Sequence, residues 1–91
     1  ALYTLDAPEN GKLISLKVRK GQLIYPGTSI VGYYQTTYGV VVALKTFVIK
    51  GKARHHTTYQ VEEIYGKEGH SYSGGQPLVG LKAINIPIYR A

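Results

Sequence analysis

The chain has 91 residues, of which 44% are hydrophobic, and this length suits one small domain with a single core. Eleven Lys and Arg residues outweigh five Asp and Glu residues, giving a formal net charge of +6. The absence of cysteine excludes disulfides, thiolate metal sites and thiol nucleophiles. No apolar run approaches the ~20 residues that a bilayer-spanning helix needs, so no membrane span is predicted.

Strand signals appear in chain order, separated by turn signals. Residues 14–19, ISLKVR, alternate apolar and polar side chains, as a half-buried strand does. Further along, GVVVALKTFVI and HTTYQV are rich in β-branched and aromatic residues. Turn-forming residues occur in PENG, YPGT, KGK and SGGQP. Since helical periodicity is nearly absent, the sequence predicts an all-β fold with short strands.

Residues 13–33 and 61–81 form an internal repeat. A shift of 48 residues superposes Gly21 on Gly69 and Gly27 on Gly75, and it also aligns a third glycine pair and several apolar positions. Two copies are too few for a solenoid, which needs at least about three units. We therefore expect two related β motifs that bury each other's apolar faces about a quasi-twofold axis, with Gly27 and Gly75 at turns of positive φ.

These repeats resemble the half-motifs of the biotinyl/lipoyl-domain family. The letters VEEIYGKEGHSYSGGQPLVGL follow the family half-motif of strand, KEG, short turn, GQPL and strand, and APENGKLISLKVRKGQLIYPGTSIV supplies the earlier half. The resemblance implies a barrel-sandwich hybrid, spanning residues 1–91 as one domain with half-motifs at 7–33 and 59–82. It also covers membrane-fusion adaptor subunits, in which related domains stack against neighbouring subunits.

The segment between the half-motifs, residues 34–60, is longer than the resemblance leads us to expect. Carrier domains of the family present a modified lysine at the tip of a hairpin in this region, and the nearest counterpart here is Lys45. Because VVVALKTFVI surrounds Lys45 with strand formers and no turn former, we expect an unmodified strand lysine. The insert is instead predicted to form an extra hairpin that docks a protein partner, by its exposed face or by strand addition.

The charges leave a second class of function open. Between Glu9 and Glu62 there is no acidic residue, whereas many lysines and arginines lie there. Together with nine tyrosines, this pattern is compatible with a β domain that binds nucleic acid or another polyanion. It is equally typical of a lysine-rich sheet surface that resists aggregation.

Residues for catalysis or metal binding are scarce in the sequence. His55 and His56 are adjacent, so on a strand they face opposite sides, and His70 lies in the second half-motif. Glu62 and Glu63 are likewise neighbours with opposed side chains. We predict no enzyme activity, no metal site and no cofactor.

The sequence thus favours a non-catalytic protein-interaction or assembly module, with a protein partner or self-association as its binding mode. The alternatives are a basic, tyrosine-rich polyanion-binding domain and a degenerate carrier domain using Lys45. The predicted interaction residues all lie in the insert: Tyr34, Tyr38, Lys45, Lys50, Lys52, Arg54, His55 and His56.

Overall fold

The described part of the chain folds entirely into β-strands and turns. The computed structural model describes residues 3–25, 27, 29–46 and 58–84. Its strands are β1 (Tyr3–Asp6), β2 (Gly11–Leu16), β3 (Leu23–Ile24), β4 (Ile30–Thr36), β5 (Val41–Lys45), β6 (Thr58–Ile64), β7 (Ser71–Tyr72) and β8 (Pro77–Ile84). No helix occurs among these residues. The all-β prediction is confirmed, and nothing in the described ranges is a helix that could cross a membrane.

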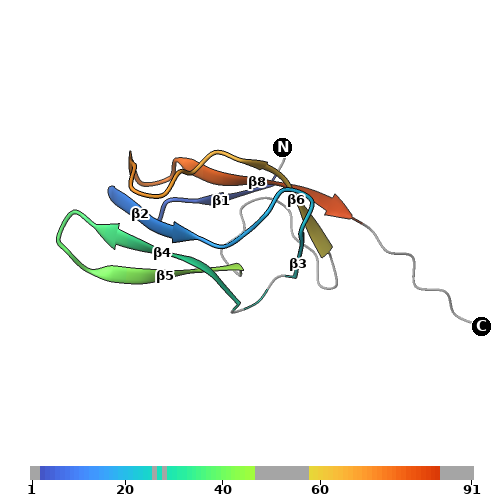
Figure 1. The fold of residues 1–91 in the computed structure, drawn as a ribbon, viewed down its shortest axis with the longest axis horizontal. Coiled ribbons are helices and arrows are strands. Elements are labelled where there is room, and N and C mark those ends of the chain that lie inside the picture. Colours follow the sequence, from blue (N-terminus) through green and yellow to red (C-terminus); the bar gives the residue numbers. More distant parts are fainter. Residues whose placement is uncertain (1–2, 26, 28, 47–57, 85–91) are drawn as a thin grey trace, which may run out of the picture.

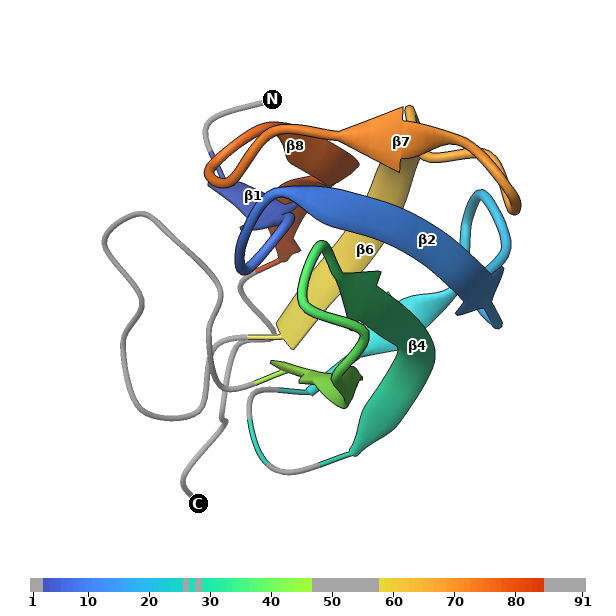
Figure 2. The ribbon, with the colours of Figure 1, turned by 90° about the vertical axis from the view of Figure 1, so that its left-hand side faces the viewer.

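The strands form two antiparallel sheets of four strands each. One sheet has the order β1-β8-β6-β3, which we call the β8 sheet, and the other has the order β5-β4-β2-β7, which we call the β4 sheet. Figure 1 shows the two sheets lying one above the other, and Figure 2 shows β2 and β4 crossing in front of β6. No strand pairing joins the two sheets into a closed barrel within the described residues.

The two sheets exchange their shortest strands. Strand β3 follows β2 in sequence but pairs with β6 of the other sheet, while β7 follows β6 and pairs with β2. The registers correspond at a shift of 48 residues, because Leu23 faces Gln60 as Ser71 faces Lys12. Each half of the chain therefore completes the sheet of the other half, so neither sheet forms without residues from both.

Irregularities recur at the same places in the two long hairpins. The β2–β4 ladder shifts register between Leu13 and Ser15, and the β6–β8 ladder shifts between Val61 and Glu63. A bulge of this kind increases the local twist and bends the strand. Both sheets consequently curve at this level and wrap around a shared core.

The core lies between the sheets and draws on seven of the eight strands. Its fully buried side chains include two large aromatic ones, Tyr34 and Tyr59, and the remaining members are aliphatic. Burying each large aliphatic side chain contributes on the order of 1.5–3 kcal/mol. The aliphatic members are Leu5, Ala7, Leu13, Val18, Ile24, Val31, Leu44, Val61, Leu78, Val79 and Leu81.

The insert predicted at residues 34–60 is only partly described. Its first residues end β4, a turn follows, and β5 pairs back onto β4. The β4–β5 hairpin therefore uses the last strand of the first half-motif and is not a separate hairpin. Residues 47–57, including the KGK turn predicted at 50–52, lie outside the described residues, and residues 58–60 begin β6.

The turn glycines differ from each other. Gly75 has a φ of 86°, as predicted, whereas Gly27 has a φ of 158°, at the border of extended backbone. The amide of Gly75 donates to the carbonyl of Ala7 at 2.8 Å, so the turn before β8 is tied to the end of β1. The left-handed conformation at Gly75 thus sets the direction in which the chain enters β8.

Candidate interaction surface

The β4–β5 hairpin ends in a three-residue loop formed by Thr37, Tyr38 and Gly39. The amide of Gly39 donates to the carbonyl of Thr36 at 2.9 Å, and the amide of Thr36 donates to the carbonyl of Val40 at 2.9 Å. Gly39 has a φ of 85°. This is the geometry of a type I turn followed by a left-handed residue, one of the common hairpin loops. The Tyr-Gly pair thus forms a turn that was not among those predicted from the sequence.

The hairpin exposes three large hydrophobic residues at and just after its tip. Tyr38 is 88% exposed, Val40 is 56% exposed and Val41 is 55% exposed. We call Tyr38, Val40 and Val41 the hairpin patch. In Figure 1 the hairpin forms one end of the molecule, away from β3. Isolated exposed apolar residues are ordinary, whereas several on one projecting hairpin make it a candidate contact surface.

Strand β5 is an edge strand of the β4 sheet. In the described residues it is also the longest of the four edge strands, the others being β1, β3 and β7. Val42 pairs with Tyr34, and the amide of Thr46 donates to the carbonyl of Ser29, so alternate residues of β5 direct their backbone groups toward β4. In an antiparallel ladder the residues between them point the other way. The N–H and C=O groups of Val41, Ala43 and Lys45 therefore face an edge that no strand of the described residues covers.

The side chains of β5 alternate between the core and the outer face. Leu44 is buried and Val42 packs against the core, whereas Val41 is exposed. Because strand side chains alternate, Val41, Ala43 and Lys45 share the outer face of the β4 sheet. Tyr33, which pairs with Ala43, lies beside them and is partly exposed, at 38%.

The structure assigns the charge asymmetry of the sequence to one sheet. None of the five acidic residues belongs to the β4 sheet, which contains Lys12 and Lys45 and is followed by Lys17 at the end of β2. The β8 sheet holds Asp6, Glu62 and Glu63.

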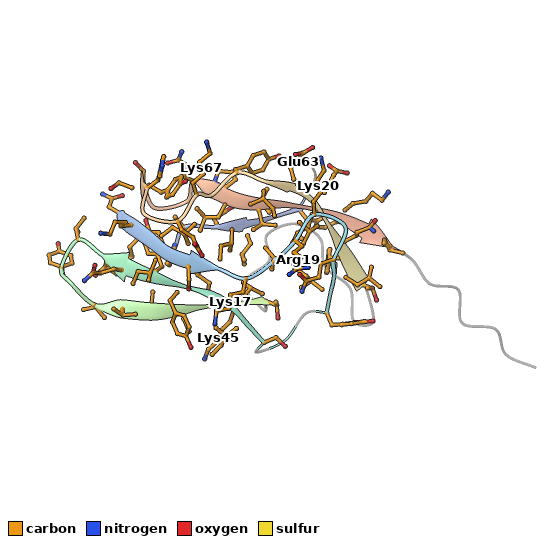
Figure 3. All side chains as sticks on the ribbon, viewed as in Figure 1. Lys17, Arg19, Lys20, Lys45, Glu63 and Lys67 are labelled. Atoms are coloured by element: carbon orange, nitrogen blue, oxygen red, sulfur yellow. The ribbon has the colours of Figure 1, made fainter. Side chains whose placement is uncertain are left out.

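Lys17 and Lys45 lie on opposite sides of β4. The amide of Lys17 donates to the carbonyl of Val31, and Lys45 pairs with Ile30, so the two lysines flank neighbouring residues of β4 (Figure 3). Figure 3 places both side chains on the same side of the molecule, with Arg19 nearby.

One acidic side chain from outside the β4 sheet reaches this end of it. The carboxylate of Glu68 accepts a hydrogen bond from the amide of Leu16, the residue before Lys17, at 3.0 Å. Glu63 pairs with Lys20 at 3.4 Å. The Lys20–Glu63 pair is exposed and so contributes little to stability.

Tyr34 does not belong to the interaction surface, and its prediction there is wrong. Its side chain is 0% exposed, and its hydroxyl lies 2.7 Å from the carbonyl of Glu9 and 3.2 Å from that of Tyr72. Burial, and next the neighbouring Tyr72 phenol, raise the pKa of Tyr34 above its ordinary value. The alternation in β4 turns Tyr33 outward and Tyr34 inward, so Tyr34 is a core residue.

Lys45 is the last residue of β5, which confirms the prediction of a strand lysine. The tip of the hairpin is occupied by Tyr38 instead. Of the other predicted interaction residues, Tyr38 lies in the hairpin patch. Lys50, Lys52, Arg54, His55 and His56 lie outside the described residues.

An open hollow of about 370 Å³ lies beside the hairpin loop. The residues that line it include Lys12, Gln35, Thr37 and Ser71. Within the described ranges, no three His, Asp or Glu side chains gather in a way that could hold a metal ion.

Comparison of the chain with protein-family models, with curated proteins and with solved structures gave no match. The functional assignment therefore depends on the geometry of the β4–β5 hairpin and the β4 sheet.

Proposed function

We propose that this chain is a non-catalytic protein-interaction module that binds its partner through the β4–β5 hairpin. The observation that carries the proposal is the hairpin patch, in which Tyr38 is 88% exposed at the tip and is followed by exposed valines on an edge strand. Tyrosine at a projecting tip supplies a large contact area at a small cost in side-chain entropy. The hairpin is held by β4, whose inner face is part of the core, so the patch rests on a rigid support.

We further propose that the domain is a barrel-sandwich hybrid of the biotinyl/lipoyl type, with two quasi-twofold related motifs. The exchange of β3 and β7 between sheets supports this, as do the matching registers and the bulges at equivalent positions. Backbone bonds also recur at the 48-residue shift, from Gly21 to Val61 and from Gly69 to Leu13. In such a module the hairpin after the first half-motif is the part free to bind a partner, and the domain would serve a larger adaptor or multidomain protein.

The proposal is tested by removing the apolar character of the patch. The variant Tyr38→Ser with Val41→Thr keeps strand-compatible residues but loses the exposed apolar area. The control variant Tyr65→Ser with Ile64→Thr makes the same chemical change at exposed positions at the end of β6. Each protein is immobilised and used to capture binding proteins from an extract of the source cells, and captured proteins are then purified and titrated directly.

We expect the hairpin variant to lose binding of a purified partner by at least about tenfold, since two contact residues of a patch centre typically contribute more than ~1 kcal/mol together. The control should bind as the original chain does. Equal binding by the two variants would contradict the proposal.

The β4 sheet also supports a second candidate, the binding of a polyanion. The specific observation is that Lys12, Lys17 and Lys45 lie on a sheet without an acidic residue. Retention that disappears after nuclease treatment of the extract would favour this candidate over the protein partner.

A further inference from the structure

We infer that the β4 sheet is extended at β5 by an acidic, extended segment of a partner protein, which adds as a fifth strand. This inference rests on the proposed function and specifies the chemistry of the partner. It draws on three features of the structure: the open backbone edge, the alternation of side chains in β5 and the distribution of charge between the two sheets.

The hydrogen-bonding pattern of the β5 backbone favours a peptide over other ligands. Val41, Ala43 and Lys45 direct alternating N–H and C=O groups to the edge, as the pairing of Val42 with Tyr34 requires. Only another strand supplies donors and acceptors at the matching spacing, so a peptide backbone satisfies these groups in the way known from strand addition. A nucleic acid offers phosphate acceptors and no such alternation.

The side chains of β5 specify an alternating partner sequence. Val42 and Leu44 lie on the core side of the sheet, and an added strand would extend the core there with apolar residues. On the outer face Lys45 would stand opposite a side chain of the added strand. Directly opposite residues in a ladder lie about 4.5–5.5 Å apart, where opposite charges stabilise and like charges destabilise the pair.

Charge decides between a second copy of this chain and a different protein. The strands of the β4 sheet hold no acidic residue, and Lys17 and Lys45 flank neighbouring residues of β4. Pairing β5 with β5 of another copy would bring two such lysine groups onto one continuous sheet, in a chain of net charge +6. An acidic segment instead places carboxylates opposite Lys45, the lysine on the edge strand itself. The favoured occupant is therefore an acidic strand of another protein.

The test uses synthetic peptides of defined chemistry. An acidic probe alternates valine with glutamate over the length of β5, and a basic probe replaces each glutamate with lysine. Amide resonances and amide hydrogen exchange of the protein are followed during titration with each probe. We expect the acidic probe to slow exchange at the amides of Val41, Ala43 and Lys45 and to leave β1 and β3 unchanged.

Variants then separate the charge from the backbone contribution. Lys45→Glu should weaken binding of the acidic probe by roughly 3- to 10-fold and strengthen binding of the basic probe. The matched control Lys82→Glu makes the same charge change on the exposed face of β8, in the other sheet. It should leave the binding of both probes unchanged. Ala43→Pro removes an N–H that faces the open edge, where proline is tolerated, and should abolish protection by the probe.

The outcomes distinguish this inference from the proposed function. Equal binding of both probes, protection at another edge, or no perturbation at about 1 mM probe, a concentration that reveals millimolar affinity, overturns strand addition. If strand addition is overturned but capture of a partner still depends on Tyr38, the proposed interaction function is supported and only the strand-addition inference is wrong. If an oligonucleotide displaces the acidic probe and binds more tightly through Lys45, the surface serves nucleic acid and the inference is overturned. If Ala43→Pro does not fold, the charge exchange at Lys45 decides alone.

Discussion

The hydroxyl of Tyr34 in β4 donates a hydrogen bond of 2.7 Å to the backbone carbonyl of Glu9, in the loop between β1 and β2. The carbonyl of Tyr72 in β7 lies 3.2 Å from the same hydroxyl. One buried phenol thus connects β4 with the loop before β2 and with the exchanged strand β7. Tyr59, the other large buried tyrosine, has no hydrogen-bond partner for its hydroxyl among the described residues, and its ring packs edge-to-face against Tyr3 at 5.2 Å.

These two tyrosines should respond differently to loss of their hydroxyls. Tyr34→Phe leaves the carbonyls of Glu9 and Tyr72 without this donor, so we expect a loss of about 1–3 kcal/mol in unfolding free energy. Tyr59→Phe removes a buried polar atom without a partner and keeps the ring contact, so its stability should be unchanged or higher. Urea denaturation of both variants measures the difference. A comparable loss in the two variants would show that the Tyr59 hydroxyl is satisfied from outside the described residues.

Stability should also fall at alkaline pH because of the same residues. Burial raises the pKa of Tyr34 and of Tyr59, with smaller contributions from Tyr72 and Tyr3, above the ordinary value of 10.0. The folded state then holds these phenol protons more tightly than the unfolded state. The contribution of these two phenols to the unfolding free energy is complete below about pH 10 and is lost as pH rises through the raised pKa values. Urea denaturation between neutral and alkaline pH should show that the unfolding free energy of the double variant Tyr34→Phe, Tyr59→Phe depends less on pH. An unchanged dependence would show that these two tyrosines do not cause the alkaline loss of stability.

Gly75 is expected to be sensitive to substitution for backbone reasons alone. It has a φ of 86°, and no atom lies within 4 Å of the position that a Cβ would take. Gly75→Ala should therefore destabilise the protein by about 1 kcal/mol through left-handed strain. Gly75→Asn should cost less, because asparagine tolerates this conformation better. Thermal unfolding of the two variants measures the two losses of stability. Equal losses would mean that they come from contacts of the new side chain and not from backbone strain.

Lys45 should remain unmodified by carrier-domain ligases. It ends β5 and is not at a hairpin tip, where a ligase would reach it. Intact-mass measurement after co-expression with biotin and lipoate ligases should give the mass of the unmodified chain. A mass increase that maps to Lys45 would restore the carrier hypothesis.

The salt dependence of binding should separate a protein partner from a polyanion. If Lys45, Lys50, Lys52 and Arg54 bound single-stranded nucleic acid, the log–log slope of affinity against salt would be about −3, from about −0.7 per contact. We expect only weak retention on heparin or oligonucleotide at physiological ionic strength, as for any strongly basic domain. Submicromolar binding that is steep in salt and is lost when these four residues are replaced would make polyanion binding the function.

Local sequence patterns predicted most of the strands but not β1. The alternation over residues 14–19 also put Ile14 on the buried face, whereas β2 spans Gly11–Leu16 and leaves Ile14 40% exposed. The alternation around Ile14 and the two glycine-punctuated segments indicated β2 to β4 and β6 to β8, because the period of two and the turn formers act over a few residues. The 48-residue shift also aligned β3 with β7 before any pairing was known. The Tyr38–Gly39 pair, which forms part of a hairpin loop, was not among the predicted turns. The first part of the insert was therefore predicted to belong to an extra hairpin.

Periodicity predicted opposite faces for Tyr33 and Tyr34, yet the sequence alone did not say which face was buried. Both residues are tyrosines, and either can pack its ring or expose it. Only the pairing of β4 with β2 and the position of Gly11 against the Tyr34 ring placed Tyr34 inside. The predicted site included Tyr34 for this reason, and it omitted Val40 and Val41, whose strand-forming character is the same in a core strand and in an edge strand.

By itself the sequence determined that the chain is all-β, where most strands lie, and that its central part carries no acid. These properties are local or compositional, so they need no knowledge of which strands meet. The tertiary structure decided that β3 and β7 exchange sheets, that β5 is an edge strand among the described residues, and that β2, β4, β5 and β7, which hold no acidic residue, form one sheet. Each of these depends on pairing between segments distant in sequence, which is set by burying the shared core rather than by any local preference.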